Sequence, residues 1–312
     1  MRNAVERYGT AAVGVALVVF FLAAAPNFAN PGNLLNVGKE TSFLAIMAVG
    51  FTLALTVGEL DLSVAELASL AAVAAGFVIQ RTGNPAAAVA AGLGVGLLGG
   101  LLNGFAVTVL RVPSLIATLG TGAIARGLAF WLTGGVAFIG RWPVAFTGLA
   151  RGQTGGVPNL LLWMTAVAAL AWLLVGGTRP GAHMVATGEA PEPARLAGIA
   201  TGRIRRFGLA LSGLLAGAAA VLLAASLSSA APAMASDYFL YAIAAVLLGM
   251  TMFQPGRPNV PGTLVASLVL KVLGNGLVLM GAAYYVQDIV LGAIIILAVA
   301  VSASTVRQAA FR

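Results

Sequence analysis

The feature that most constrains this chain is a series of long apolar runs separated by short polar connections. A helix needs about 20 apolar residues to cross the hydrocarbon core of a bilayer, and runs of that size recur along nearly the whole sequence. They fall near residues 10–26, 41–57, 62–80, 86–109, 114–133, 158–175, 207–227, 238–253, 262–281 and 283–303. Only 8% of the 312 residues are charged, against about 25% in soluble domains. We predict an all-α membrane protein with about ten transmembrane helices in a single domain, residues 1–312.

The distribution of basic residues orients these helices, because cytoplasmic connections carry an excess of Arg and Lys. With ten spans both termini lie on one side. The connections on that side hold Arg2, Arg7, Arg111, Arg179, Arg195, Arg203, Arg205, Arg206, Arg257, Arg307 and Arg312, and those on the other side hold Lys39, Arg81, Arg141 and Arg151. Eleven against four predicts cytoplasmic termini. The net charge of +8 then reflects topology, and we expect contact with membrane lipid and none with nucleic acid.

Polar groups at membrane depth are the candidates for a translocation path. Glu59, Asp61 and Ser63 lie in the stretch GELDLSVAE between the second and third spans, which also contains Glu66. On helical spacing, Glu59 and Glu66 would share a face. A structural alternative is that Asp61 begins a helix and caps its free backbone donors.

Three further path candidates, Asn103, Arg126 and Asn275, lie inside other spans, as does the charged residue Lys271. Arg126 and Lys271 are expected to pair with a carboxylate or to extend toward the membrane surface. Asn103 and Asn275 could contact a hydroxylated substrate, but hydrogen bonds between helices are an alternative role for both.

Catalysis and metal binding find little support in the sequence. The chain has no cysteine and a single histidine, His183, so thiol chemistry and thiolate metal sites are excluded. The carboxylates lack metal-ligand spacing, and no nucleophile with a nearby base is evident. We therefore expect a non-enzymatic protein without a metal site, and an intramembrane enzyme is the weakest interpretation.

Glycines recur at every fourth position in the fourth span. Small residues at this spacing let helices approach closely in lipid, so this stripe predicts helix packing. Its members are Gly92, Gly96, Gly100 and Gly104. Gly213 and Gly217 repeat the spacing in the seventh span.

Several separated stretches, in a fixed order, resemble one family. They are VGELDLSVAELASLAA, NGFAVTVLRVPSLIATLGTGAIARGLAFWLTGG, EPARLAGI, YFLYAIAAVLLG and GTLVASLVLKVLGNGLVLMG. Over residues 33–303 the chain is similar to the membrane subunits of ATP-binding-cassette sugar importers of the ribose, xylose and galactose type. The resemblance implies a bacterial cytoplasmic-membrane permease that transports a monosaccharide by alternating access.

The resemblance also implies partners. They are an ATPase subunit that binds ATP and Mg, a second copy or a related permease, and a periplasmic or lipid-anchored binding protein delivering sugar to residues 134–157 and 228–237. This chain holds no cofactor of its own, and it contains no GxxxxGK[ST] phosphate loop.

In this family a short cytoplasmic helix couples the permease to its ATPase, which would explain the charged segment in loop 176–206. Pro193 is tolerated in a first helical turn, Glu189 and Glu192 suit the positive helix end, and Gly198 can close the helix with Ile199 as apolar contact. The implied docking surface is Ala194, Arg195, Leu196 and Ile199.

The chain departs from the family pattern at Glu59, at Phe239 and Tyr241, and in the segment TMFQPGRPNVPGT. These departures leave the sugar open, and also whether the permease pairs with itself or with a relative. Two alternatives stay open as well: a related branched-chain amino-acid permease, and a secondary transporter driven by protons or sodium.

Overall fold

The computed structural model describes residues 2–310, which form thirteen helices and four two-residue strands. The helices are α1 (Arg2–Ala24), α2 (Pro31–Thr56), α3 (Val64–Thr82), α4 (Pro85–Thr108), α5 (Ser114–Thr133), α6 (Val144–Arg151), α7 (Asn159–Gly177), α8 (Arg179–Glu189), α9 (Pro191–Leu196), α10 (Thr201–Leu227), α11 (Tyr238–Gly249), α12 (Val260–Leu279) and α13 (Tyr284–Ala310). The strands are β1 (Phe138–Ile139), β2 (Gln153–Thr154), β3 (Val157–Pro158) and β4 (Ser229–Ala230).

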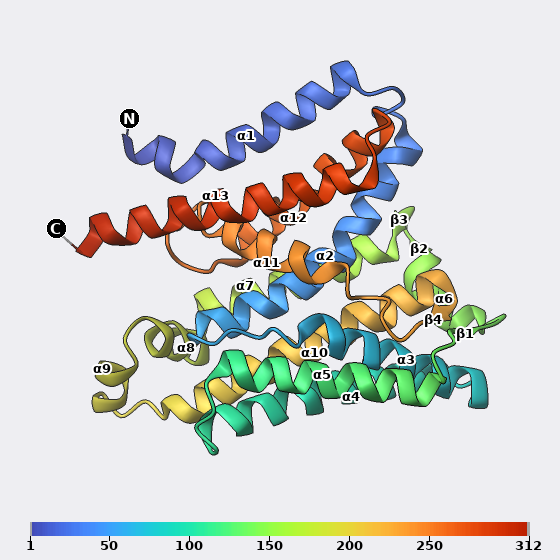
Figure 1. Ribbon diagram of the computed structural model, residues 1–312, viewed down its shortest axis with the longest axis horizontal. Coiled ribbons are helices and arrows are strands. Elements are labelled where there is room, and N and C mark those ends of the chain that lie inside the picture. The colour runs from blue at the N-terminus through green and yellow to red at the C-terminus, as the bar shows by residue number, and fades with distance from the viewer. Residues whose placement is uncertain (1, 311–312) are drawn as a thin grey trace.

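The long helices form a bundle with two distinct ends (Figure 1). Both chain termini, the α8–α9 segment and the α4–α5 connection lie at one end, and the α1–α2 connection and all four strands lie at the other. Within the described residues, seven helices are long and apolar enough to cross a membrane: α2, α3, α4, α5, α7, α10 and α12. Three further apolar helical stretches are shorter, at Ala12–Ala24, Tyr238–Gly249 and Tyr285–Ala298.

Several helix boundaries differ from the predicted runs. Helix α2 begins at Pro31, about ten residues earlier than predicted, because Asn30 caps it by accepting a hydrogen bond from the Gly32 amide. The expectation that Lys39 lies in a connection was therefore wrong. Helix α11 ends at Gly249 and not at residue 253, and α10 begins at Thr201, so the charged loop is shorter than residues 176–206.

The glycine stripe of α4 packs against α10, as its spacing predicted. A Cβ atom added to Gly96 would overlap the Gly213 carbonyl oxygen, and one on Gly100 would overlap that of Leu209. Gly217 lies against Gly92 and Gly96. Glycine on both helices thus brings the two backbones into direct contact, and no larger side chain fits between them.

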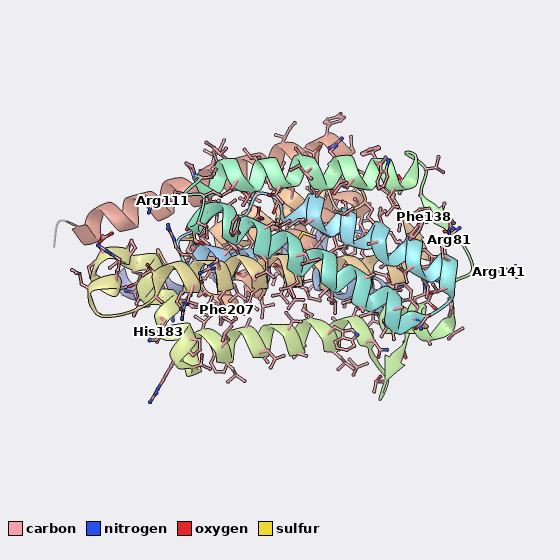
Figure 2. All side chains as sticks on the ribbon, turned by 90° about the horizontal axis from the view of Figure 1, so that it is seen from below. Arg81, Arg111, Phe138, Arg141, His183 and Phe207 are labelled. Atoms are coloured by element: carbon pink, nitrogen blue, oxygen red, sulfur yellow. The ribbon has the colours of Figure 1, made fainter. Side chains whose placement is uncertain are left out.

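The connections at the strand end fold onto one another. Strand β1 pairs with β4 in antiparallel register, with Phe138 opposite Ala230, so the segments 134–157 and 228–237 meet. Beneath them Trp142 is buried and packs edge-on against Phe146. Figure 2 shows Arg81, Phe138 and Arg141 at this end of the bundle, and Arg111, His183 and Phe207 toward the opposite end.

Candidate functional site

The connection between α2 and α3, residues 57–63, holds a buried polar node of Asp61, Ser63 and Asn103, all 0% exposed. Asp61 Oδ1 accepts hydrogen bonds from the Ser63 amide at 3.1 Å and the Ser63 hydroxyl at 2.5 Å. Asn103 Nδ2 donates to Ser63 Oγ at 2.7 Å and approaches Asp61 Oδ1 at 3.4 Å. We call this set the Asp61 node. It joins α4 to the start of α3.

Asp61 does not cap α3 as expected. Ser63 occupies the cap position, and no side chain accepts from the first turn. The Asp61 carboxylate instead closes a local turn onto Ser63, while the buried Ser212 hydroxyl of α10 faces the same carboxylate. Among the described residues Asp61 Oδ2 has no hydrogen-bond partner. Burial raises the pKa of Asp61 above its usual 3.8, against the opposing effect of the hydrogen bonds from Ser63 and of the nearby Ser212 hydroxyl.

Helix α5 holds the same connection in place through one hydroxyl. Thr118 Oγ1 donates to the Leu60 carbonyl at 3.2 Å and accepts from the Leu62 amide at 3.1 Å. The Ser114 hydroxyl accepts weakly from the Leu60 amide at 3.4 Å. Thr118 was not predicted as a site residue, because a threonine one turn into an apolar helix gives only a weak signal in the sequence.

Glu59 lies outside α3, so the expectation that it shares a helix face with Glu66 was wrong. Its side chain is 3% exposed and pairs with Arg205 Nε of α10 at 2.5 Å. Burial raises the pKa of Glu59, and the Ser114 hydroxyl and the Arg205 charge partly offset that rise. The pair links the α2–α3 connection to the first turns of α10.

The end of α8 packs directly on the same connection. A Cβ atom on Gly188 would overlap the Thr56 carbonyl oxygen and lie 3.0 Å from the Gly58 amide nitrogen. Gly58 itself has φ +82°, a conformation that favours glycine. Two close backbone contacts therefore join the end of α8 to the residues around Asp61, and the Glu59–Arg205 pair joins the same residues to α10.

Helix α9 ends in the predicted left-handed turn. Gly198 has φ +85°, the Ile199 amide donates to the Ala194 carbonyl at 3.0 Å, and the Gly198 amide donates to the Arg195 carbonyl at 3.0 Å. This bonding pattern is a Schellman motif. Leu196 projects into the surroundings with 83% of its surface exposed.

Two residues of the predicted coupling segment are placed differently from what the sequence predicted. Ala194 is only 5% exposed because α9 packs this face against α8 and α10, so its inclusion in the docking surface was wrong. Glu189 is the last residue of α8, away from the positive end of that helix, and it pairs with Arg257 at 2.9 Å. Glu192 does lie in the first turn of α9, where it pairs with Arg195 at 2.8 Å.

The charged groups inside spans are paired, as expected. Arg126 Nη1 lies 3.7 Å from Glu66 Oε1, which also accepts a hydrogen bond from the Ser236 hydroxyl at 3.0 Å. These three side chains line a cavity of about 260 Å³ between α3, α5 and the start of α11. Lys271 of α12 lies 3.6 Å from Glu40 of α2.

Asn275 is engaged between helices. Its Nδ2 donates to Asn33 Oδ1, and Asn33 Nδ2 donates in return to Asn275 Oδ1, each at 2.9 Å. The structure therefore divides the path candidates into an Asp61 node, an Arg126–Glu66 pair and an Asn275–Asn33 pair. No three His, Asp or Glu side chains come together at metal-binding distance within the described part of the chain.

The sequence of this chain is similar to those of known transport proteins. A family model described as "Branched-chain amino acid transport system / permease component" matches residues 33–299. The ribose import permease protein RbsC of Escherichia coli (strain K12) is 37% identical over 289 residues, covering 91% of this chain and 90% of that protein. RbsC of Bacillus subtilis (strain 168) is 33% identical, with 91% of this chain and 88% of that protein covered. The L-arabinose transport system permease protein AraH of Escherichia coli (strain K12) is 32% identical, with 94% of this chain and 89% of that protein covered.

Proposed function

The chain belongs to the branched-chain amino acid transport system / permease component family, and on that premise we propose that it is the membrane subunit of an ATP-binding-cassette importer for a pentose- or hexose-type monosaccharide. The observation that carries this proposal is the similarity, over about nine-tenths of both chains, to ribose and L-arabinose permeases. The family description also covers branched-chain amino-acid permeases, but the names of the three relatives compared above specify ribose or L-arabinose as the substrate.

In this proposal residues 1–312 form one permease domain in the bacterial cytoplasmic membrane, crossed about ten times. The α8–α9 end faces the cytoplasm together with both termini. The exposed arginines support this orientation. Arg111 lies at that end, as does the α8–α9 segment, which contains Arg179 and Arg195, and Arg81 and Arg141 lie at the other end. Because Arg and Lys are enriched on the cytoplasmic side, the more basic end is the inner one.

The loop within residues 176–206 serves as the coupling element. Leu196 and Arg195, exposed on α9, would enter a groove of a separate ATPase subunit that binds ATP and Mg. Closure of two such ATPases would push on α9. The push would then reach the α2–α3 connection through the Gly58–Gly188 contact and the Glu59–Arg205 pair.

At the opposite end, the paired segments 134–157 and 228–237 would receive a periplasmic or lipid-anchored binding protein. A second permease, identical or related, completes the translocation unit. The chain itself would carry out no chemistry, and it moves sugar by alternating access with contacts weak enough to permit release.

Co-purification from native membranes tests the coupling role. We expect an ATPase subunit to accompany the wild type and to be lost at least tenfold in Leu196→Asp, because a charge replaces the apolar docking side chain. Val144→Asp is the matched control: Val144 is 84% exposed on α6 at the other end of the bundle, so the ATPase should be retained.

The two results that contradict the coupling role are distinct. If the wild type carries no ATPase subunit under mild extraction, the importer assignment fails. If Leu196→Asp retains the ATPase and takes up D-ribose or L-arabinose at the wild-type rate, α9 is not the coupling helix, although the importer assignment stands.

A further inference from the structure

Six polar or charged side chains gather around the start of α11, away from the Asp61 node. They come from α2, the residue before α11, α11 itself, α12 and α13. We call this set the α11 cluster: Glu40, Asp237, Tyr238, Tyr241, Lys271 and Asp288.

Lys271 is the centre of the α11 cluster. Its ammonium group lies 4.8 Å from the Tyr238 ring centre and 5.3 Å from that of Tyr241, and 3.6 Å from Glu40 Oε2. Eleven residues separate it from the start of α12 at Val260, which is about 17 Å of helix. A charge so far along a spanning helix lies deep in the membrane, where it needs polar partners.

The carboxylates of the α11 cluster are open to the surroundings. Glu40 remains 62% exposed, and Asp237 and Asp288 are exposed as well. Neither aspartate makes a hydrogen bond or an ion pair with another side chain that the structure describes, although both lie in the neighbourhood of Tyr241. Three exposed carboxylates beside one lysine are too costly to place in hydrocarbon, so this face of the bundle meets water, a substrate or a polar partner.

The cluster continues into the cavity described above. Ser236 adjoins Asp237 in the chain and donates to Glu66, and the 260 Å³ cavity that it lines also contains Arg126 and Phe239. Arg126 is 56% exposed on α5. Polar groups from α3, α5, α2 and α12 therefore lie near the start of α11, including Arg126 and Lys271.

We propose that the α11 cluster lines the sugar path and binds the hydroxyl groups of a neutral monosaccharide in transit. This inference rests on the proposed function. Ionised carboxylates only accept hydrogen bonds and ammonium groups only donate them, so the cluster offers a sugar hydroxyl both kinds of partner. The tyrosine rings add apolar faces with a polar edge, which suit the C–H face of a sugar ring. Because the three carboxylates are exposed, their contacts with a sugar would stay weak, as transport requires.

The absence of cysteine from the chain permits a direct test by single-cysteine labelling. Leu240 is 52% exposed on α11, one turn from Asp237, and is not a member of the cluster. In proteoliposomes holding the complete transporter, Leu240→Cys should react with a charged, membrane-impermeant thiol reagent in at least one of the nucleotide-free and vanadate-trapped states. Transported D-ribose or L-arabinose should slow that reaction severalfold. Leu170→Cys is the control, because Leu170 is 68% exposed in the middle of α7, which lies at the opposite edge of the bundle from α5 (Figure 2); it should stay unreactive.

Transport by charge-neutral variants forms the second arm. We expect Asp237→Asn and Asp288→Asn each to lower sugar uptake about tenfold, with unchanged protein level and unchanged co-purification of the ATPase subunit. Tyr241→Phe, which keeps the ring face, should lower uptake less than threefold, and Tyr241→Leu should lower it more.

The outcomes separate this inference from the proposed function. Wild-type protein that takes up neither sugar with ATP overturns the proposed function. Wild-type uptake together with an unreactive Leu240→Cys in both states overturns the α11 cluster as part of the path. Wild-type uptake with a reactive Leu240→Cys that sugar does not protect, and normal uptake by both asparagine variants, also overturns it.

Discussion

The Asp61 node and the α11 cluster contain similar groups in opposite settings. Asp61, Ser63 and Asn103 are completely buried and bonded to one another, and the backbones of α4 and α10 close around them. In the α11 cluster, Glu40, Asp237 and Asp288 are exposed, and two of them have no hydrogen-bonding or ion-pair partner among the described side chains.

The contrast shows which polar groups in a membrane protein are available for transport. A carboxylate that is hydrogen-bonded inside a sealed bundle holds helices in register. One that stays open on a helix face at membrane depth has to meet water, a substrate or a partner. The following predictions test how well the node is sealed and how independent it is of the open face.

The largest effect is expected from a larger side chain in the close contact between α4 and α10. Gly213→Val places a branched side chain against the Gly96 carbonyl and the Gly100 backbone, which cannot retreat, so we expect a loss of about 3 kcal/mol, the upper end for overpacking. Thermal unfolding of the purified protein in detergent measures it. Gly120→Val on α5 is the control, since a Cβ atom there meets nothing within 4 Å, and its melting temperature should change little. Equal melting temperatures for both variants would show that α4 and α10 are not rigidly packed.

This packing was the part of the fold that could be predicted from the sequence. The four-residue glycine spacing of α4 and the pair in α10 are local patterns, and helix–helix packing in lipid depends on them directly. The early start of α2 could not be predicted from hydropathy, because Lys39 and Glu40 interrupt its apolar run. Asn30 and Pro31 carried that signal, since an asparagine before a proline favours a helix start.

The second prediction removes the acceptor at the centre of the node. Asp61→Leu leaves the Ser63 amide and the Ser63 hydroxyl without their buried acceptor, and we expect about 2 kcal/mol of destabilisation. Asp61→Asn is the matched variant: it keeps an oxygen in the same place and should stay within about 1 kcal/mol of wild type. Chemical unfolding in mixed micelles compares the two, and an Asp61→Leu protein as stable as Asp61→Asn would contradict a structural role for these bonds.

The same carboxyl predicts a pH dependence. Its pKa is raised in the folded protein above about 3.8 by burial, so the folded state favours the protonated form. That stabilisation is fully present below pH 3.8 and is lost as the pH rises through the folded pKa. Asp61→Asn lacks this dependence, and its stability relative to wild type should therefore increase from low to neutral pH. Parallel stability curves for the two proteins would rule the assignment out.

The third prediction concerns the link between the sealed node and the coupling loop. Arg205→Leu leaves the buried Glu59 carboxylate without its ion pair, and since the arginine is partly exposed we expect only about 1 kcal/mol of destabilisation. Sugar uptake by Arg205→Leu should fall further than the small loss of stability alone would explain. The exchange Glu59→Arg with Arg205→Glu should recover part of the lost uptake. Uptake per molecule of protein is the measurement. Normal uptake by Arg205→Leu would mean that the coupling force takes another route.

The partners of the candidate residues were the part that the sequence could not supply. Glu59 and Glu66 are seven residues apart, yet one faces Arg205 and the other Arg126 and Ser236, because the chain turns at Gly58 and starts a new helix only at Val64. Helical spacing does not apply across such a turn. Tyr238, Glu40 and Lys271 come together from three helices, and no spacing within one of them predicts that meeting.

The smallest effect is expected at the Asn33–Asn275 pair. This pair is only partly buried, so its exposure is intermediate between that of the Asp61 node and that of the α11 cluster. Hydrogen bonds between membrane helices contribute about 0.6 kcal/mol on average, so Asn275→Leu should lower stability by about that amount. The double variant Asn33→Leu with Asn275→Leu should regain part of the loss, because no amide is then left without its partner. A double-mutant cycle on thermal stability gives the coupling, with sugar uptake measured in parallel. Near-normal uptake in the double variant would assign Asn275 to helix packing. A selective loss of uptake at full stability would instead place this pair with the open face and the sugar path.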